Sequence, residues 1–505
     1  MAFPAFILLV LCHLFSGYGL LTLFNIRQKT VVTLALSLIL GVGVASFVPF
    51  VLQLCYIPLT PATVFGSLAF ACLLLNIRTI LPIGGAGEFS IRSFRERWGR
   101  FFRECGRRVR ASRLLPYEVP FVLILGFLVF VSVWRCYYLP PTSRDALSGP
   151  EAIAEYAVRE HTMINSFFNV DLWTTNNQFK SPFLISLQII YKMAGFPFGQ
   201  IWLSIIFVSF TVLLYQVLKE RLHPIIAGLL LLLFMMVPEL YAYTFMILYD
   251  YSNMVFLFLS LYFLFDYCKN KISGTLAFAG LLMGIATYIR SETLALALFF
   301  IPVLLLLQWR EKYSYRQMAL SNALFILPAV IGYYLPVHLY IGHYLPVHYN
   351  VTDLVNQHLS DLQPLFKRYG DIGSRLLTGE LAIHLWGYFM FVWAALFLSE
   401  GIFLRRFNRE ARNWLYATGA IFIGLGLLGY LLPLFDLIDT TKRGLFKMLP
   451  FMLLYMANNE GLLRLSAWIS RWENAVPAVQ TPGKIQQKKG AEKALSTPGG
   501  KKQRK

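Results

Sequence analysis

Long apolar runs separated by short charged segments dominate the chain. Stretches such as Ile225–Val237, Met254–Phe265 and Ile421–Leu434 contain no charged residue. Many apolar stretches extend to about 20 residues, the length that a helix needs to cross a hydrocarbon core of ~30 Å. Continuous runs of this length favour helices over the short alternating strands of a membrane barrel. The pattern therefore predicts an all-α polytopic membrane protein.

The positions of the apolar runs predict about 13 transmembrane helices. They lie near residues 2–24, 31–55, 62–76, 119–139, 201–218, 224–242, 251–268, 276–288, 293–308, 320–341, 384–403, 414–434 and 445–465. A further apolar stretch, 181–195, carries Lys192, and we expect it to lie as a helix at the outer membrane surface.

The predicted spans divide the chain into an N-terminal three-helix part, a basic loop, a transmembrane core and a basic tail. The loop is expected in the cytosol or on the adjacent lipid surface, the core carries two larger outer loops, and the tail is expected to be disordered and cytosolic. In this order the parts are 1–77, 78–118, 119–465 with outer loops 140–198 and 342–383, and 466–505.

The distribution of charged residues predicts how these parts are oriented across the membrane. Only 14% of the residues are charged, yet the net charge is +19. Basic residues cluster in short segments between apolar runs, as the positive-inside rule predicts for cytosolic loops. We therefore attribute the excess to topology and expect no nucleic-acid partner. The alternation places the N-terminus outside and the C-terminus in the cytosol.

The first outer loop carries a candidate general base. Pro140 and Pro141 end the preceding helix, and Asp145 follows just beyond the membrane boundary. A carboxylate there can accept a proton from an acceptor hydroxyl or amine. The alternative, which local sequence favours, is a turn or capping aspartate. Asp250, at the next outer turn, either approaches Asp145 in space or only caps its own helix.

A helix is expected directly after Asp145. Ser148 is a suitable cap for it, with Pro150 in its first turn. Glu155 and Arg159 are four residues apart and should pair on its exposed face.

Basic residues near the last spans are candidate anion ligands. Lys442, Arg443 and Lys447 precede the final span on the outer side, against the positive-inside trend. A lipid phosphate needs such donors, whereas snorkelling at the interface is the alternative. Arg290 and Glu292 lie at an outer turn between apolar helices, where ionisable residues are functional or form a structural ion pair.

The sequence does not indicate a metal site or another cofactor. The second outer loop and its exit carry histidines, but without HExxH or a comparable spacing, so a divalent metal is not indicated. These histidines are His343, His348, His358 and His384. The six scattered cysteines support neither a disulfide framework nor a thiolate site.

Five segments occur in an order that is typical of one family. Pro141–Arg159 places an acidic residue before an outer helix, and Ser181–Pro197 is a Pro-led helix ending in Gly-Phe-Pro. Asp250 opens a later span. Gly280–Phe299 contains Tyr-Ile-Arg-Ser-Glu before a Leu-rich helix, and Lys442–Pro450 is a basic-aromatic stretch running into Leu-Pro.

In these segments the chain resembles the GT-C superfamily of integral membrane glycosyltransferases. The pattern is most similar to the bacterial protein O-mannosyltransferase and lipid A aminoarabinose transferase type. The resemblance covers about Val119–Leu465, and Ser291 stands where the family often has proline.

The resemblance implies a GT-C-like core in a bacterial inner membrane. The implied reaction transfers a sugar, with inversion, from a polyprenyl-phosphate donor to a lipid, glycan or protein acceptor on the extracytoplasmic face. The implied catalytic residues are Asp145 and Asp250, the donor-phosphate ligands are Arg290, Lys442, Arg443 and Lys447, and the supporting residues are Arg144 and Glu292.

Other functions stay open at this stage. A transporter or flippase of a lipid-linked substrate favours broken helices and charges at the membrane midplane, whereas the notable charges here lie at the outer boundary. A protein like the O-antigen polymerases and ligases would use the second outer loop, with Arg368 and Arg375. A structural membrane subunit leaves the polar first outer loop unexplained.

Overall fold

The described part of the molecule is helical throughout. The computed structural model describes residues 2–77, 115–169, 180–344, 365–378, 381–404, 407–431 and 440–475, and the single positions 99, 103, 106 and 107. No strand occurs in these ranges. Most of the basic loop 78–118, the centre of the second outer loop and the tail beyond 475 lie outside the described residues.

Eight helical segments of the described ranges are long and apolar enough to cross a membrane. This agrees with the predicted polytopic membrane architecture. The segments are α1 (Ala2–Leu23), α2 (Thr30–Leu54), α6 (Val119–Tyr138), α10 (Ile201–Lys219), α13 (Tyr249–Asn270), α15 (Thr293–Leu298) with α16 (Ile301–Arg310), α17 (Tyr315–Tyr334) and α23 (Arg409–Leu431).

The other expected spans are shorter or interrupted, so the number 13 stays a prediction. α3 (Pro61–Leu75) and α14 (Ser273–Ile289) are short continuous helices. Each of the other three expected spans is divided into two helices. One division lies just before Pro238, because proline lacks the N–H that a continuing helix needs. The divided spans are α11 (Pro224–Met235) with α12 (Pro238–Ala242), α21 (Leu381–Trp386) with α22 (Phe389–Ser399), and α25 (Leu449–Ala457) with α26 (Glu460–Ala475).

Short helices extend some of these helices or connect them, and the candidate spans of α6 and α17 include the short helices that adjoin them. They are η1 (Pro116–Glu118), η2 (Ser166–Asn169), η4 (Leu335–Ile341), α18 (Gly342–Tyr344), α20 (Leu365–Asp371), η5 (Ile372–Leu377), η6 (Glu400–Leu404), α24 (Lys442–Leu445) and η8 (Phe446–Met448). α26 corrects one expectation, because residues 466–475 are helical rather than part of a disordered tail.

Helix α13 lies at the centre of the bundle. It has the largest buried share of the eight candidate spans, and Phe256, Leu257 and Phe258 are fully buried. Asp250 in its first turn and Lys269 in its last turn are about 28 Å apart along the helix axis, from a rise of ~1.5 Å per residue. This length matches a hydrocarbon core of ~30 Å. We call the two ends of the bundle the Asp250 end and the Lys269 end.

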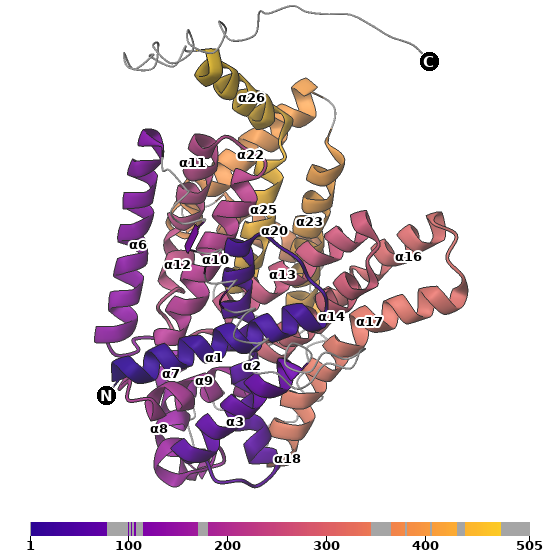
Figure 1. Cartoon of the computed structure of the whole chain (residues 1–505). Coiled ribbons are helices and arrows are strands. Elements are labelled where there is room, and N and C mark those ends of the chain that lie inside the picture. Colours follow the sequence, from indigo (N-terminus) through magenta and orange to yellow (C-terminus); the bar gives the residue numbers. More distant parts are fainter. Residues whose placement is uncertain are drawn as a thin grey trace, which may run out of the picture.

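The helices do not all run in one direction (Figure 1). α6, α10 and α11 run along the bundle, whereas α1 lies across their direction and packs on α2. α16 and α17 extend from the bundle as an arm, while α7 (Arg144–Leu147), α8 (Pro150–Glu160) and α9 (Pro182–Met193) gather at the Asp250 end.

The helices of the first outer loop differ in two respects from the expectation. Gly149, not Ser148, is the N-cap of α8, and the Ser148 hydroxyl donates to the Arg144 carbonyl at 2.8 Å. α9 is buried against α2 and α8 rather than lying at the surface. Lys192 lies 2.7 Å from Glu151 because its ammonium group needs a partner once α9 is covered.

The expected pair on α8 is confirmed. The Arg159 guanidinium lies 2.7 Å from the Glu155 carboxylate, four residues earlier on the same exposed face.

A close crossing of α14 and α17 positions the turn that carries Arg290. A Cβ at Gly284 would lie 2.6 Å from the Pro328 carbonyl oxygen, and one at Gly332 would lie 2.1 Å from the Gly284 carbonyl oxygen. Small residues let two membrane helices approach to backbone contact in this way. Because Arg290 directly follows α14, this crossing also fixes the position of the Arg290 backbone.

Gly284→Ala should therefore destabilise the protein. The added methyl group forces α14 and α17 apart, and overpacking of this kind costs about 1–3 kcal/mol. Thermal unfolding of the purified protein in detergent measures the effect. Gly126→Ala is the matched control, because a Cβ at Gly126 in α6 meets no atom within 4 Å. Equal thermal stability of the two variants would contradict the close crossing.

Candidate functional site

A break between two helices places Asp145. Pro140 and Pro141 follow α6 and end it. Ser143 then caps α7, where its hydroxyl oxygen accepts the Ala146 N–H at 3.2 Å. Asp145 lies in the first turn of α7, at the Asp250 end of the bundle.

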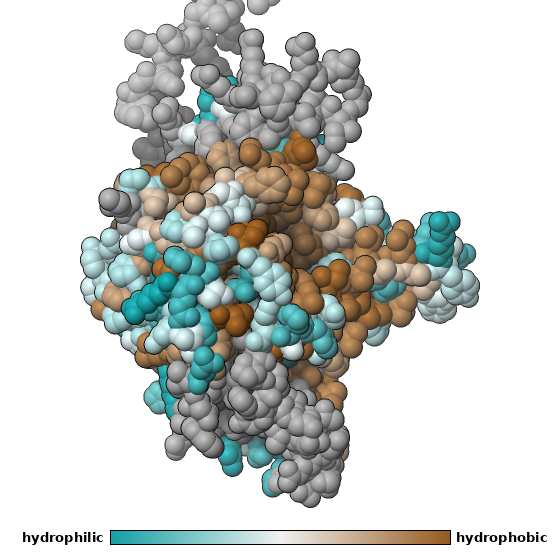
Figure 2. Space-filling model, turned by 90° about the horizontal axis from the view of Figure 1, so that it is seen from below, coloured by the Kyte–Doolittle hydropathy of each residue, from teal (hydrophilic) through white to brown (hydrophobic). Residues whose placement is uncertain are grey.

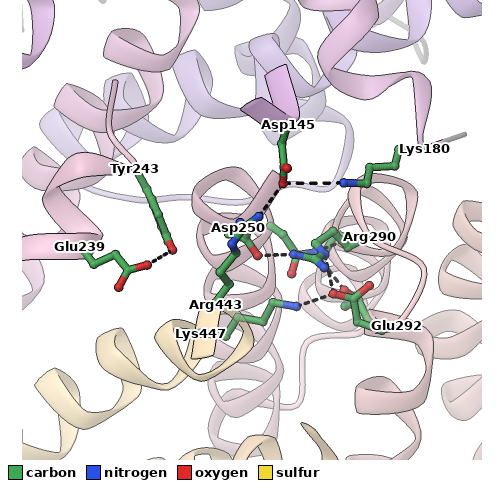
Figure 3. Close-up of polar contacts among 12 residues, drawn as sticks. Asp145, Lys180, Glu239, Tyr243, Asp250, Arg290, Glu292, Arg443 and Lys447 are labelled. Carbon is green, nitrogen blue, oxygen red and sulfur yellow. Dashed lines mark hydrogen bonds and ion pairs between the residues drawn. The ribbon is translucent and has the colours of Figure 1, made fainter. Parts of the chain in front are cut away.

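Two cations face the Asp145 carboxylate (Figure 3). Arg443 of α24 donates to it at 2.6 Å, and the Lys180 ammonium nitrogen lies 3.9 Å away. Burial among its neighbours lowers the pKa of Lys180, Asp145 raises it, and Arg290 lowers it, with a net shift downward. Asp145 is therefore an ion-paired carboxylate, held by residues that lie far from it in the sequence.

A second set of ion pairs, linked one to the next like a chain, starts at Asp250. Arg290 binds the Asp250 carboxylate and also lies 2.5 Å from Glu292. Lys447 completes the chain at 3.0 Å from Glu292. The Asp250 and Lys447 side chains are almost fully buried. The charge of Asp250 therefore depends on Arg290 for its stabilisation, and the charge of Lys447 depends on Glu292.

The charge of Glu292 is held by its two partners. Burial opposes its ionisation, but Arg290 and Lys447 outweigh burial and lower the pKa of this carboxyl to about 2. An unfolded glutamate titrates near pH ~4.3. The ion pairs of Glu292 therefore contribute their full stability above that pH and lose it as the pH falls toward 2.

The two sets of ion pairs belong to one site. Burial lowers the pKa of Arg443, but its hydrogen bond to Asp145 and its interaction with Asp250 raise it overall. We call the combined set of three carboxylates and four cations the charged cluster, with a formal net charge of +1. Its members are Asp145, Asp250, Glu292, Lys180, Arg290, Arg443 and Lys447.

A tyrosine and a further ion pair lie beside the charged cluster. Tyr243 donates a hydrogen bond of 2.5 Å to Glu239, and Lys442 lies 2.9 Å from the same carboxylate. Burial and the nearby carboxylates Glu239 and Asp250 raise the pKa of Tyr243, so its phenol is neutral at physiological pH. Glu239 therefore gathers two donors next to Arg443.

The structure brings most of the sequence-predicted site residues together. Asp145, Asp250, Arg290, Glu292, Arg443 and Lys447 all belong to the charged cluster, and Lys442 lies beside it. The Lys447 side chain is fully buried behind Glu292.

Arg144 does not join the cluster. Its exposed side chain lines a separate surface cavity of about 410 Å³ with Thr142, Leu147, Ser148 and Phe167. Successive residues of a helix point in different directions, so Arg144 diverges from Asp145 although the two are adjacent in sequence.

Sequence reasoning missed Lys180, Glu239 and Tyr243. Glu239 lies inside a stretch that was expected to span the membrane, and an acidic residue in such a run is itself a signal of function. Lys180 directly precedes the Ser181–Pro182 start of α9, in a loop expected on the outer side, where basic residues are uncommon. Tyr243 gave no comparable signal.

The second outer loop contacts the same end of the bundle. Arg368 of α20 donates to the Thr441 hydroxyl at 2.5 Å, next to Lys442. His348, His358 and the rest of 345–364 lie outside the described residues. Among the residues that the structure does describe, no group of three or more His, Cys, Asp and Glu side chains could hold a metal ion.

Comparison with known proteins finds no matching family model, no matching curated protein and no matching solved structure. The geometry of the charged cluster is therefore the basis for a functional proposal.

Glu292→Gln should strongly destabilise the protein. The change leaves the buried Lys447 ammonium without its anion, and breaking a buried pair costs about 3–5 kcal/mol. Glu460→Gln removes a surface pair with Arg464 and should cost about 1 kcal/mol or less. Chemical denaturation in detergent micelles compares the two variants. Equal losses of unfolding free energy would show that the Glu292 pairs are not structural.

Proposed function

We propose that the protein is a membrane glycosyltransferase that moves a sugar from a polyprenyl-phosphate donor to an acceptor. The observation that carries the proposal is the charged cluster, in which Asp145 and Asp250 meet Arg290 and Arg443 at one end of a membrane bundle. Such an enzyme needs a base for its acceptor and cations for its phosphate leaving group, and both are within one cluster.

The cations suit a lipid-linked phosphate. The formal net charge of +1 favours an anionic ligand, and guanidinium groups such as Arg443 and Arg290 match phosphate oxygens in two-point contacts. Donor phosphate would compete with Asp145 for Arg443 and Lys180, which now hold that carboxylate. Donor binding thereby releases Asp145 for the acceptor.

Asp145 then serves as the base. The acceptor oxygen or nitrogen attacks the anomeric carbon of the sugar, and its proton passes to the Asp145 carboxylate. The bond between the anomeric carbon and the phosphate oxygen breaks, with inversion, and its electron pair leaves on the polyprenyl phosphate. Arg443 and Arg290 stabilise the negative charge that develops on that phosphate.

The remaining members of the cluster act as positioning residues. Asp250 and Glu292 hold the Arg290 guanidinium from two sides. Lys447 fixes Glu292 from the bundle interior and does not reach solvent. A preorganised cation of this kind needs no reorientation as the leaving group departs.

The surface around this end suits a donor with a long apolar tail. Figure 2 shows the Asp250 end of the molecule, where polar residues gather beside an apolar band that continues onto the arm of α16 and α17. A polyprenyl chain can follow such a band in the membrane while its phosphate stays at the polar boundary.

The charged cluster also weighs against a transporter. Transporters bind their substrates near the bilayer midplane, whereas Asp250 lies in the first turn of α13, at one end of a membrane-length helix. Asp145 lies in a short helix outside any candidate span.

Asp145→Asn should abolish most sugar transfer. The amide keeps the shape of the side chain but cannot accept the proton, and loss of a general base costs about a hundredfold or more in rate. Transfer from a radiolabelled polyprenyl-phosphate sugar pool in membranes measures the loss, at equal protein level. Glu155→Gln, which removes an exposed carboxylate of α8, is the control and should retain full transfer. Unchanged transfer by Asp145→Asn would remove this residue from the mechanism, and no transfer by the wild type from any pool would favour the transporter.

Arg443→Gln should raise the KM for the donor more than the KM for the acceptor. A charge-assisted hydrogen bond contributes about 1.5–3 kcal/mol, so we expect the donor KM to rise about tenfold or more. Arg144 is next to Asp145 in the sequence, but its exposed guanidinium lines another cavity. Arg144→Gln should therefore leave the donor KM unchanged. A rise confined to the acceptor KM would assign Arg443 to the acceptor instead.

A further inference from the structure

A second cavity, lined by charged and aromatic residues, lies at the Lys269 end of the bundle. It has a volume of about 170 Å³ and is formed by the end of α13, the start of α23 and the connection after α10. Tyr262, Phe265 and Trp414 form its aromatic part. The charged cluster lies at the other end of α13, about 28 Å away along the helix axis.

Basic side chains predominate around this cavity. Arg221, Lys269 and Arg409 line it together with the carboxylates Asp266 and Glu410, which gives a formal net charge of +1. Arg221 lies 2.5 Å from Glu410, and Lys269 lies 3.0 Å from it. Arg409 is exposed and has no ion pair or hydrogen bond within the described ranges. Its guanidinium is therefore available to an anion at the cavity.

A buried hydrogen-bond donor at the same cavity lacks an acceptor. Trp414 is only 4% exposed, and its indole N–H has no partner among the residues described. An indole nitrogen can donate but not accept, and buried donors are normally satisfied. Because this nitrogen has no accessible surface, Trp414 contributes the aromatic wall of the cavity rather than a donor to a ligand.

The cavity lies where membrane-length helices end. α13 and α23 are both candidate spans, and the cavity is lined by the C-terminal turns of α13 and the first turns of α23. The headgroups of membrane lipids occupy this boundary, and basic pockets between membrane helices bind anionic headgroups.

We propose that this cavity binds the phosphate of an anionic phospholipid. Arg409 contacts the phosphate oxygens, while Lys269 and Arg221 contribute positive charge from the rim. The site is separate from the charged cluster, so lipid binding here does not depend on the proposed sugar transfer.

Native mass spectrometry of the detergent-purified protein tests this proposal, with dioctanoyl-phosphatidylglycerol as the probe. We expect saturable binding to the wild type and about tenfold or more weaker binding to Arg409→Gln, because a charge-assisted hydrogen bond is lost. Trp414→Phe keeps an aromatic wall and removes an N–H that does not reach the cavity, so it should bind the probe as the wild type does. Thermal unfolding of each variant verifies that it is folded.

Arg310→Gln is the matched control, because Arg310 is an exposed basic residue at the end of α16 that does not line the cavity. It should bind the probe as the wild type does, and dioctanoyl-phosphatidylcholine should bind more weakly than the anionic lipid. Equal loss in Arg310→Gln, or no saturable binding by the wild type, would overturn the proposal. Displacement of the probe by inorganic phosphate at the same concentrations would overturn the lipid assignment.

Discussion

The structure depends on the need to neutralise charges that are buried at the edge of a membrane bundle. Lys447 is fully buried, and Asp250 and Glu292 are nearly so, in a protein that is otherwise dominated by apolar contacts. An isolated charge there would cost several kcal/mol. The alternating chain of Asp250, Arg290, Glu292 and Lys447 removes that cost by giving each ion an opposite neighbour. It also ties α13, the turn after α14 and the start of the last helices to one another.

Asp145 and Arg443 occupy a different position in this arrangement. They are partly exposed, and their pair lies at the open side of the buried chain. A ligand can exchange with a partly exposed pair at less cost than with a buried one, because water and the ligand replace the lost contact. The buried chain of ion pairs therefore acts as a rigid support, and in the proposed mechanism the substrate enters at the partly exposed pair. The close crossing of α14 and α17 holds that support in place.

Apolar patterning predicted the membrane helices because lipid imposes length and hydrophobicity directly on the sequence. It did not predict the break before Pro238 or the burial of α9, which depend on how neighbouring helices pack. Several site residues could be selected individually because charges near membrane depth are rare. The sequence alone could not show that these residues lie together in space, since Asp145 and Arg443 are 298 positions apart. Arg144 shows the limit of sequence proximity, because it is adjacent to Asp145 yet lines another cavity.

In the proposed mechanism, the charged cluster holds a lipid-linked phosphate. Cryo-electron microscopy of the protein in lipid nanodiscs loaded with polyprenyl phosphate tests it most directly. We expect phosphate density within hydrogen-bond distance of Arg443 and close to Arg290, with Asp145 released from its ion pair. Phosphate density only at the Lys269 end, with the Asp145–Arg443 pair intact at saturating polyprenyl phosphate, would contradict it.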